Sequence, residues 1–397
     1  MSGSDRLSVA PGESPNQETK KFSANIIIHR TGQLGDTIVS LPAMRAIRAA
    51  YPNHNLVLLT DRQLDSGLVS AWHVLSAAGL FSDVLFYVPP SGESKMVRWF
   101  GLLKLAFTIR RLKPQALFYL RDFPGNRPGR DAFFFRVLCG ISGCYGFEPT
   151  NHLFGRRDSR GHLTRFPSEV IRLLELVART GVPLPHPDEI EFSLPISGKE
   201  RSRIDALWRE AGIPARALLI GLGPGSKMAA KQWPLQRFIE VGRDLLVNLP
   251  GCWLIIFGGP GDRELGNKIR DVLGDRVINA AGRLSVLESA EALRRCSVYV
   301  GNDTGVMHLA AAAGTPCVGI FSARDHPGRW EPYGLHHIVL RKEPSCAGCL
   351  LEVCIKHDMI CLKEIRVSEV MHAIRYILRA KTDWEANASQ ISDMAVD

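Results

Sequence analysis

Short apolar segments alternate with helical segments along most of this chain of 397 residues, and this alternation limits the possible folds more than any other feature. The apolar segments are rich in Ile, Leu and Val, as in Asn25–Arg30 and Trp253–Phe257. Parallel strands need long crossover connections, usually helices, and therefore give this pattern. The sequence predicts an α/β protein built on doubly wound parallel sheets.

The alternation is interrupted once, at residues 181–199, where prolines are frequent and helical periodicity is weak. Length by itself predicts two or three domains. We expect an N-terminal Rossmann-like domain at 23–195, a C-terminal Rossmann-like domain at 196–366 and a further helix at 367–383. The polar ends, 1–22 and 384–397, are predicted to be a disordered tail and a flexible tail.

Composition excludes some classes of protein. No run approaches the ~20 apolar residues that a membrane-spanning helix needs. Nine cysteines are too few for a disulfide scaffold of this length, which predicts reduced thiols and a cytoplasmic location. A net charge of +9 favours anionic partners such as nucleotide-sugars, anionic lipids or nucleic acid.

A basic, aromatic segment at Lys95–Lys113 has two interpretations. It predicts a helix packed on a sheet with a solvated face, or a peripheral contact with an anionic membrane. Four arginines that could face an anionic acceptor follow it, namely Arg121, Arg127, Arg130 and Arg136.

The stretch from Val298 to Pro316 predicts a strand, a tight turn and a helix of small residues. The start of such a helix offers backbone N–H groups and the positive end of a dipole, which favour a phosphate or pyrophosphate. Asp303 or Thr304 could instead simply cap the helix.

A second candidate site is Arg30–Thr37, at the carboxyl end of the first predicted strand. Gly32 and Gly35 allow a tight turn or the close approach of a substrate. Asp36 is expected at a helix N-terminus, either as a cap or as a general base that accepts a proton from an acceptor hydroxyl. Pro42 predicts that this helix bends or starts late.

Two glycine-rich turns follow strands in the second half. The first, Gly221–Pro234, could be mistaken for a dinucleotide fingerprint, but a polar, cationic loop replaces the helix that should follow directly. We therefore predict a loop that faces phosphate, with Lys227 or Lys231 as its cation. The second, Phe257–Glu264, is typical of nucleotide pockets and of structural corners alike.

Four cysteines lie within a short segment, at Cys346, Cys349, Cys354 and Cys361, with His357 among them. This spacing predicts a tetrahedral site for a structural Zn or Fe ion. Free thiols or oxidation-sensitive pairs are the alternatives.

In this order, the motifs resemble glycosyltransferase family 9, the ADP-heptose:lipopolysaccharide heptosyltransferase family, over roughly residues 23–380. Four features carry the resemblance: Gly35-Asp36 with Pro42 and Tyr51-Pro52; Gly223-x-Gly225-Ser226 followed by Lys231-x-Trp233-Pro234; Phe257-Gly258-Gly259; and Asp303-Thr304-Gly305 with His308, Ala310, Gly314 and Pro316.

The resemblance implies a GT-B fold, in which two Rossmann-like domains face a cleft and the C-terminal helix crosses back. It implies inverting transfer of a heptose from ADP-heptose to a glycan acceptor such as lipopolysaccharide core, with no catalytic cofactor and no nucleic acid. Asp36 would be the general base and the four cysteines would hold a structural metal. The donor would be bound by Gly35, Gly225, Ser226, Lys231, Gly258, Asp303, Thr304, Gly305 and His308.

Three alternatives stay open on the sequence. The chain could be an NAD-dependent enzyme that uses Gly221–Ser226. It could be a transferase of the same fold with another nucleotide-sugar or a protein acceptor. It could also be a non-catalytic binding protein that kept the fold.

Overall fold

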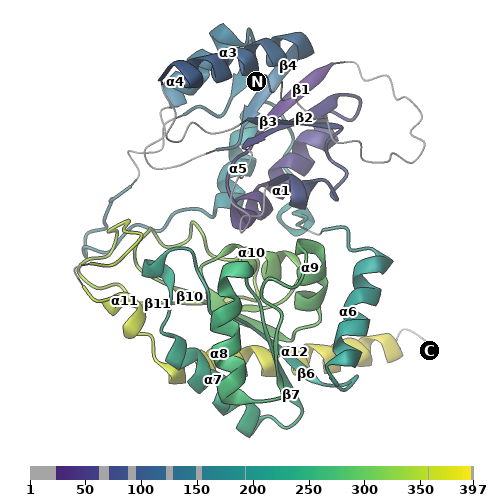
Figure 1. The fold of residues 1–397 in the computed structure, drawn as a ribbon, viewed down its shortest axis with the longest axis vertical. Coiled ribbons are helices and arrows are strands. Elements are labelled where there is room, and N and C mark those ends of the chain that lie inside the picture. The colour runs from purple at the N-terminus through teal and green to yellow at the C-terminus, as the bar shows by residue number, and fades with distance from the viewer. Residues whose placement is uncertain are drawn as a thin grey trace, which may run out of the picture.

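The computed structural model describes residues 24–61, 71–87, 95–121, 128–148, 154–192, 194–355 and 357–394. They form two α/β domains, each built on a parallel sheet (Figure 1), which confirms the predicted fold class. The predicted disordered tail at 1–22 lies outside the described residues.

The N-terminal sheet has five strands in the order β3-β2-β1-β4-β5. On the central strand β1, Ile26 and Ile28 enter one apolar cluster and Ile27 enters another, because side chains alternate between the faces of a strand. Helices α1, α2 and α5 cover one face, and α3 with a π-helical segment covers the other. The bounds are β1 Asn25–His29, α1 Leu34–Ala50, β2 Asn55–Asp61, α2 Ala71–Leu75, β3 Asp83–Tyr87, α3 Lys95–Leu112, β4 Pro114–Tyr119, α4 Pro128–Phe133, the π-helical segment Phe134–Leu138, β5 Gly143–Tyr145 and α5 Glu169–Ala178.

The C-terminal sheet has six strands in the order β11-β10-β9-β6-β7-β8. Helices α6, α9 and α10 cover the face toward the N-terminal domain, and α7, α8 and α12 cover the other (Figure 1). The bounds are α6 Gly198–Glu210, β6 Leu218–Gly223, α7 Leu235–Asn248, β7 Cys252–Ile256, α8 Arg263–Leu273, β8 Val277–Asn279, α9 Val286–Arg294, β9 Val298–Asn302, α10 Gly305–Ala312, β10 Cys317–Phe321, β11 Ile338–Arg341, α11 Ile360–Lys363 and α12 Val367–Met394.

The two domains meet through α1 and α10. One apolar cluster runs from beneath α1 in the N-terminal domain to beneath α10 in the C-terminal domain. Each of these helices directly follows a central strand of its sheet, so the carboxyl ends of β1 and β9 face each other. In open α/β sheets this is the edge at which ligands bind.

Residues 154–166 belong to the segment predicted as N-terminal domain, but they lie on the C-terminal domain. The Gly155 amide donates to His326 Nε2 over 2.8 Å, and His326 Nδ1 donates to the Thr164 carbonyl over 2.8 Å. Phe166 stacks on the His326 ring at 4.0 Å between centroids. We call residues 154–166 the arm; it precedes α5, which returns to the N-terminal domain.

Helix α1 does not start late: it begins at Leu34 and continues through Pro42, because its buried face compensates for one missing backbone hydrogen bond. Helix α12 continues to Met394, so residues 384–394 are helical rather than a flexible tail; they contain neither Gly nor Pro. Residues 395–397 lie outside the described residues.

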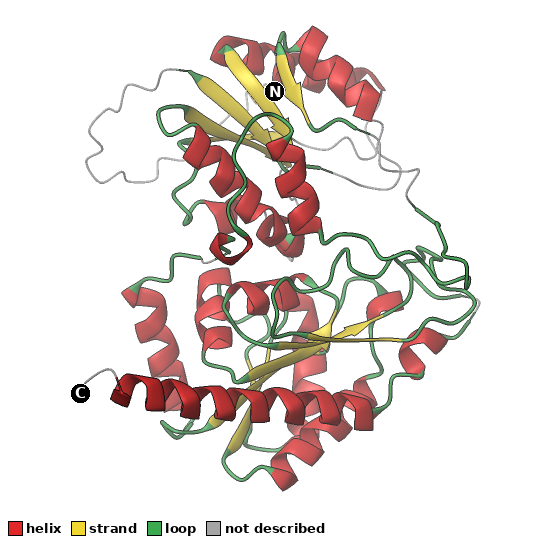
Figure 2. Cartoon of the chain, turned by 180° about the vertical axis from the view of Figure 1, so that it is seen from behind, coloured by secondary structure: helices red, strands yellow, loops and turns green. Residues whose placement is uncertain are grey.

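The C-terminal helix also packs differently from the expected crossing. Val370, Met371, Ile374 and Ile377 of α12 join the apolar cluster beneath the C-terminal sheet. Figure 2 shows α12 running along that domain, so it does not cross back to the N-terminal domain. Within the described residues, no helix is both long and apolar enough to traverse a lipid bilayer.

Candidate active site between the domains

Asp36 lies in the first turn of α1, immediately beyond the carboxyl end of β1. Its Oδ2 accepts a hydrogen bond from the Gln33 amide at 2.9 Å, and its side chain is 22% exposed. Asp36 therefore helps to cap the helix from its third position, while the helix itself begins after Gln33. The capping and the catalytic interpretations are compatible, because one carboxylate oxygen makes the cap and the side chain stays accessible.

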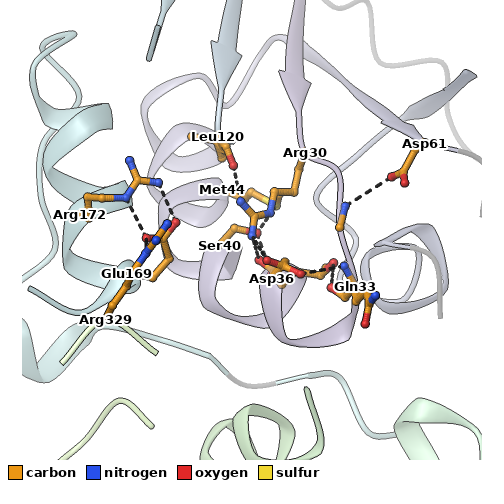
Figure 3. Close-up of polar contacts among 12 residues, drawn as sticks. Arg30, Gln33, Asp36, Ser40, Met44, Asp61, Leu120, Glu169, Arg172 and Arg329 are labelled. Atoms are coloured by element: carbon orange, nitrogen blue, oxygen red, sulfur yellow. Dashed lines mark hydrogen bonds and ion pairs between the residues drawn. The ribbon is translucent and has the colours of Figure 1, made fainter. Parts of the chain in front are cut away.

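Arg30 contacts both the side chain and the carbonyl of Asp36. The sequence analysis did not assign Arg30 a role. Its buried guanidinium lies 3.5 Å from Asp36 Oδ1, donates to the Asp36 carbonyl at 2.5 Å and donates to the Leu120 carbonyl (Figure 3). Burial lowers the pKa of Arg30, an effect that the charge of Asp36 opposes. A charged residue directly after a buried strand was the sequence signal that could have identified it.

The first turn of α1 contacts the first turn of α10 through two glycines, Gly35 and Gly305. A Cβ on Gly35 would lie 2.9 Å from His308 Cδ2 and 3.2 Å from Gly305 Cα. A Cβ on Gly305 would lie 2.9 Å from the Gly35 nitrogen and from Leu34 Cβ. Both positions therefore exclude larger side chains, which explains their glycines by packing.

His308 is the residue around which the two halves of the predicted site meet. Burial lowers the pKa of its imidazole, and the charges of Asp303, Lys231 and Asp36 act on it in turn. Asp303 and Lys231 belong to the C-terminal domain and Asp36 to the N-terminal domain. The start of α1 also packs directly on His308, since a Cβ on Gly35 would lie 2.9 Å from His308 Cδ2.

Lys231 and Asp303 form an ion pair, with Lys231 Nζ 2.6 Å from Asp303 Oδ2. Their side chains are only 15% and 11% exposed. Thr304 follows as the N-cap residue of α10, although no cap hydrogen bond from its side chain is seen. A mostly buried ammonium beside a helix start is a suitable setting for a diphosphate.

Asn302, which sequence reasoning missed, holds the loop that carries Lys231. Its buried amide donates to the carbonyls of Pro224 and Gly225 at 2.8 and 3.3 Å. Its Oδ1 accepts from the Trp233 amide at 3.1 Å. One side chain at the end of β9 therefore fixes both ends of the loop. Its sequence signal was a polar residue that ends an otherwise apolar strand.

Ser226 lies inside this loop. Its hydroxyl accepts from the Met228 amide at 3.3 Å, and its carbonyl accepts from Gln232 Nε2 at 2.6 Å. These bonds close the loop upon itself, which places its backbone at the carboxyl end of β6.

The second glycine-rich turn, Phe257–Glu264, surrounds the side chain of Asp262. Its Oδ2 accepts from the Gly259 amide at 2.8 Å, and a Cβ on Gly258 would lie 2.6 Å from Asp262 Cβ. A Cβ on Gly225 would overlap the same carboxylate, so Gly225 and Gly258 meet there. Burial raises the pKa of Asp262, and the charge of Lys227 opposes this. Lys227 thus acts on Asp262, whereas Lys231 pairs with Asp303.

The dinucleotide alternative is not supported by the geometry of Gly221 and Gly223. Both lie within β6, where a Cβ would meet the buried Tyr299 ring. The next α-helix, α7, begins only at Leu235. These glycines therefore serve packing in the sheet, and the helix that would bind a dinucleotide pyrophosphate does not follow them.

The four cysteines line one small cavity together with His357, some distance along the chain from this site. The pKa of Cys361 is raised by burial and also by the neighbouring Cys346, Cys349 and Cys354. Over the part of the chain that the structure describes, however, no three His, Cys, Asp or Glu side chains are arranged as ligands of one ion. The thiols are gathered without forming a closed coordination site.

The arginines after α3 have separate positions. Burial lowers the pKa of His29, and the charge of Arg121, which follows β4, lowers it further. Arg130 pairs with Asp131 at 3.1 Å, and Arg136 donates to the Cys144 carbonyl at 3.2 Å. Arg127 lies outside the described residues.

Two facing parallel-sheet domains, with the site where their helix starts meet, define a GT-B protein. Solved structures show the same fold. The glycosyl transferase family 9 from Veillonella parvula matches with a TM-score of 0.68 and 20% identity, covering 91% of this chain and 99% of that one. The E. coli ADP-heptose LPS heptosyltransferase II matches with a TM-score of 0.61 and 19% identity, covering 90% and 99%.

The family model "Glycosyltransferase family 9 (heptosyltransferase)" matches residues 131–360, more than half of the chain, and the chain belongs to this family. Among its relatives, the Haemophilus influenzae lipooligosaccharide heptosyltransferase 2 is 25% identical over 173 residues, which are 41% of this chain and 49% of that protein. The first relatives are therefore matched over about half of their length or less. A Campylobacter jejuni lipooligosaccharide heptosyltransferase 2 is 21% identical over 88% of this chain and 98% of its own.

Proposed function

We propose that this protein is an inverting glycosyltransferase that moves a heptose from ADP-heptose to a glycan acceptor of the lipopolysaccharide core. One observation carries the proposal: the first turn of α1, which bears Asp36, packs against Gly305 and His308 of α10, directly after the Lys231–Asp303 pair. Family membership and the heptosyltransferase relatives support the reaction and the donor.

Asp36 would act as the general base, since it combines an accessible carboxylate with a position at the domain contact. It would take the proton of the acceptor hydroxyl as that oxygen attacks the anomeric carbon and the bond to ADP breaks. Inversion needs one displacement, so a single base suffices and no covalent intermediate forms.

The C-terminal domain would bind the departing ADP. Lys231 and the start of α10 at Thr304 and Gly305 would face the diphosphate, with Ser226, Gly225 and Gly258 lining the neighbouring loops. Because ADP gains negative charge as the glycosidic bond breaks, these groups would stabilise the transition state more than the bound donor. Asp303 would release Lys231 to the phosphates and then contact the sugar.

The test separates binding from chemistry. In Asp36→Asn we expect transfer to fall by about 10²–10⁴-fold, the range of general-base effects, while calorimetry shows unchanged ADP affinity. In Lys231→Met we expect weaker binding of ADP and ADP-heptose. Asp188→Asn and Lys268→Met are the controls, because both side chains are well exposed and lie outside the site.

Each outcome has a defined meaning. Normal turnover of Asp36→Asn would refute the base, and unchanged donor affinity of Lys231→Met would refute the phosphate site. Binding of a UDP-sugar instead would keep the transferase and change its donor. Transfer of the sugar to a peptide would keep the transferase and change its acceptor. Binding of ADP-heptose without any transfer would favour a non-catalytic binding protein. Tight NADH binding without competition from ADP would overturn the proposal.

The proposal extends to the cysteine cavity, where the four thiols would bind one structural Zn or Fe ion. Four thiols match the donor set of such sites, and the Met359 amide donates to Cys354 Sγ at 3.3 Å. The fold relative TibC from E. coli is described as iron-containing. Elemental analysis of the purified protein tests whether the ion is bound. The metal content should fall in Cys349→Ser and stay unchanged in the control Cys252→Ser, whose thiol is buried elsewhere. Metal-free wild-type protein would refute the metal site.

We further propose that the protein works in the cytoplasm, peripherally at the inner face of the membrane. A glycolipid acceptor requires such a position, and the positive charge of the N-terminal domain supports it.

A further inference from the structure

The outer face of the N-terminal domain carries an unusual concentration of exposed apolar side chains. Trp99, Phe100 and Phe107 of α3 are 59%, 67% and 62% exposed. Of the 19 large apolar side chains that are exposed in the described residues, nine lie here. We call them the α3 surface: Met96, Val97, Trp99, Phe100, Leu102, Leu103 and Phe107, with Phe133 and Val137 from the adjoining α4 and π-helical segment.

The fold does not require this many apolar residues on α3. Only Ala106 and Ile109 of the helix are fully part of the apolar cluster beneath it. Arg110 ties the helix to the π-helical segment by donating to the Leu138 carbonyl at 3.2 Å. A helix that buries so few apolar residues normally has polar residues on its remaining surface. A large exposed apolar area therefore marks a contact surface.

The charge of α3 indicates which partner fits. Helix α3 contains five Lys and Arg and no Asp or Glu: Lys95, Arg98, Lys104, Arg110 and Arg111. The Arg111 guanidinium lies 5.7 Å from the Phe107 ring centroid, so cation and ring share one surface. Aromatic rings interleaved with cations, without carboxylates, match the boundary between acyl chains and anionic headgroups.

A second copy of the chain fits this surface less well. Two such surfaces would bring like charges together, because Asp131, the carboxylate of the adjoining α4, already pairs with Arg130 at 3.1 Å, and this disfavours association. Anionic lipid phosphates supply the missing counter-charge and also accept the apolar side chains.

We infer that the α3 surface is the face with which this protein lies on an anionic lipid bilayer. Helix α3 covers the face of the N-terminal sheet opposite to α1, so a bilayer there leaves the α1–α10 contact uncovered (Figure 1). The apolar N-terminal half of α3 follows β3 and lies toward the sheet edge from which α1 starts. That this edge presents a membrane-held acceptor to Asp36 rests on the proposed function, whereas the bilayer contact is argued from the side chains of the α3 surface alone.

The test is co-sedimentation of the full chain with vesicles of phosphatidylcholine with or without about 30 mol% phosphatidylglycerol, at low salt and at about 0.5 M salt. Trp99→Ser/Phe100→Ser removes apolar contacts, and Lys104→Glu/Arg111→Glu reverses charge. Val247→Ser/Tyr376→Ser is the control, because it removes equally exposed apolar groups from the C-terminal domain.

We expect wild type and control to bind the anionic vesicles and to release them at high salt. Trp99→Ser/Phe100→Ser should lower the partition coefficient at least about tenfold, and the charge reversal should abolish the preference for anionic lipid. Calorimetry with ADP-heptose on each variant tests the proposed function separately. Failure of the bilayer contact can therefore be distinguished from failure of the proposed function.

Three results would overturn the inference. The first is wild-type protein that stays in the supernatant, and the second is a Trp99→Ser/Phe100→Ser variant that binds vesicles as well as wild type does. The third is concentration-dependent self-association in light scattering that the same variant abolishes while vesicle binding is unaffected, which would make the surface an interface between copies.

Discussion

A buried ion pair joins the two domains beside the proposed site, and its removal is the sharpest test of how they are held together. Glu169 at the start of α5 accepts from Arg172 Nη2 and Nε at 2.7 and 2.8 Å, and its Oε2 lies 3.6 Å from Arg329 Nε of the C-terminal domain (Figure 3). Glu169 and Arg329 are 1% and 3% exposed. The substitution Glu169→Gln keeps the shape of the side chain and removes its charge.

The expected loss follows from burial. Arg172 is 19% exposed and can reach water, whereas Arg329 would become a buried cation without its main counter-ion. Removing one partner of a buried pair costs about 3–5 kcal/mol. Glu291→Gln is a matched control, because Glu291 is equally buried but its partners Arg294 and Arg295 are 51% and 23% exposed. There we expect a loss of about 1–2 kcal/mol.

Urea unfolding followed by intrinsic fluorescence, with both variants beside wild type, measures the difference in the free energy of unfolding. Burial would raise the pKa of Glu169, but Arg172 and then Arg329 and Arg30 outweigh it, so the pKa lies below 4.5 in the folded protein. The advantage of wild type over Glu169→Gln is therefore complete above that value and declines as the pH falls below it. A loss no larger than that of Glu291→Gln, or one independent of pH down to unfolding, would refute the reasoning.

Three further predictions test the site. Gly305→Ala places a Cβ 2.9 Å from the Gly35 nitrogen, and overpacking of this kind should lower the free energy of unfolding in urea by about 1–3 kcal/mol. Gly261→Ala is the control, because the space around Gly261 is open and the substitution should be neutral. Equal effects of the two substitutions would contradict the packed contact. Asn302→Ala frees both ends of the Lys231 loop and should weaken ADP binding in calorimetry by about tenfold or more; an unchanged Kd would show that the loop is held otherwise. Because burial lowers the pKa of His308 below 6.5, its midpoint in an NMR titration should lie below that value. As the pH falls below 6.5, the unfolded chain takes up a proton at His308 before the folded protein does, so the free energy of unfolding should fall. A midpoint at or above 6.5 would contradict the burial of His308.

Much of each domain could be predicted from the sequence, because the patterns that determine it are local. The apolar run before Arg30 and the one before Asp303 had to be buried strands, and glycine-rich turns after strands had to lie at the carboxyl edge of a sheet. The short strands Gly143–Tyr145 and Ile338–Arg341 were missed, since a few residues at a sheet edge carry little periodicity.

The candidate site was predicted residue by residue, but its assembly was not. Asp36, Lys231 and Asp303 came from motifs, whereas the supporting residues Arg30 and Asn302 act through hydrogen bonds to carbonyls far away in sequence. No spacing rule reports such contacts. The choice between Lys227 and Lys231 likewise depended on the ion pair that Lys231 forms with Asp303.

The sequence by itself therefore determined two parallel-sheet domains and the strand ends at which chemistry is expected, because the periodic burial of apolar side chains is encoded in each segment. Only the tertiary structure decided that Gly35 packs on Gly305, that the arm at 154–166 lies on the C-terminal domain and that α12 stays with the C-terminal sheet. These outcomes depend on how whole surfaces fit together. The free energy of such a fit is shared among residues distant in sequence, and no local pattern contains it.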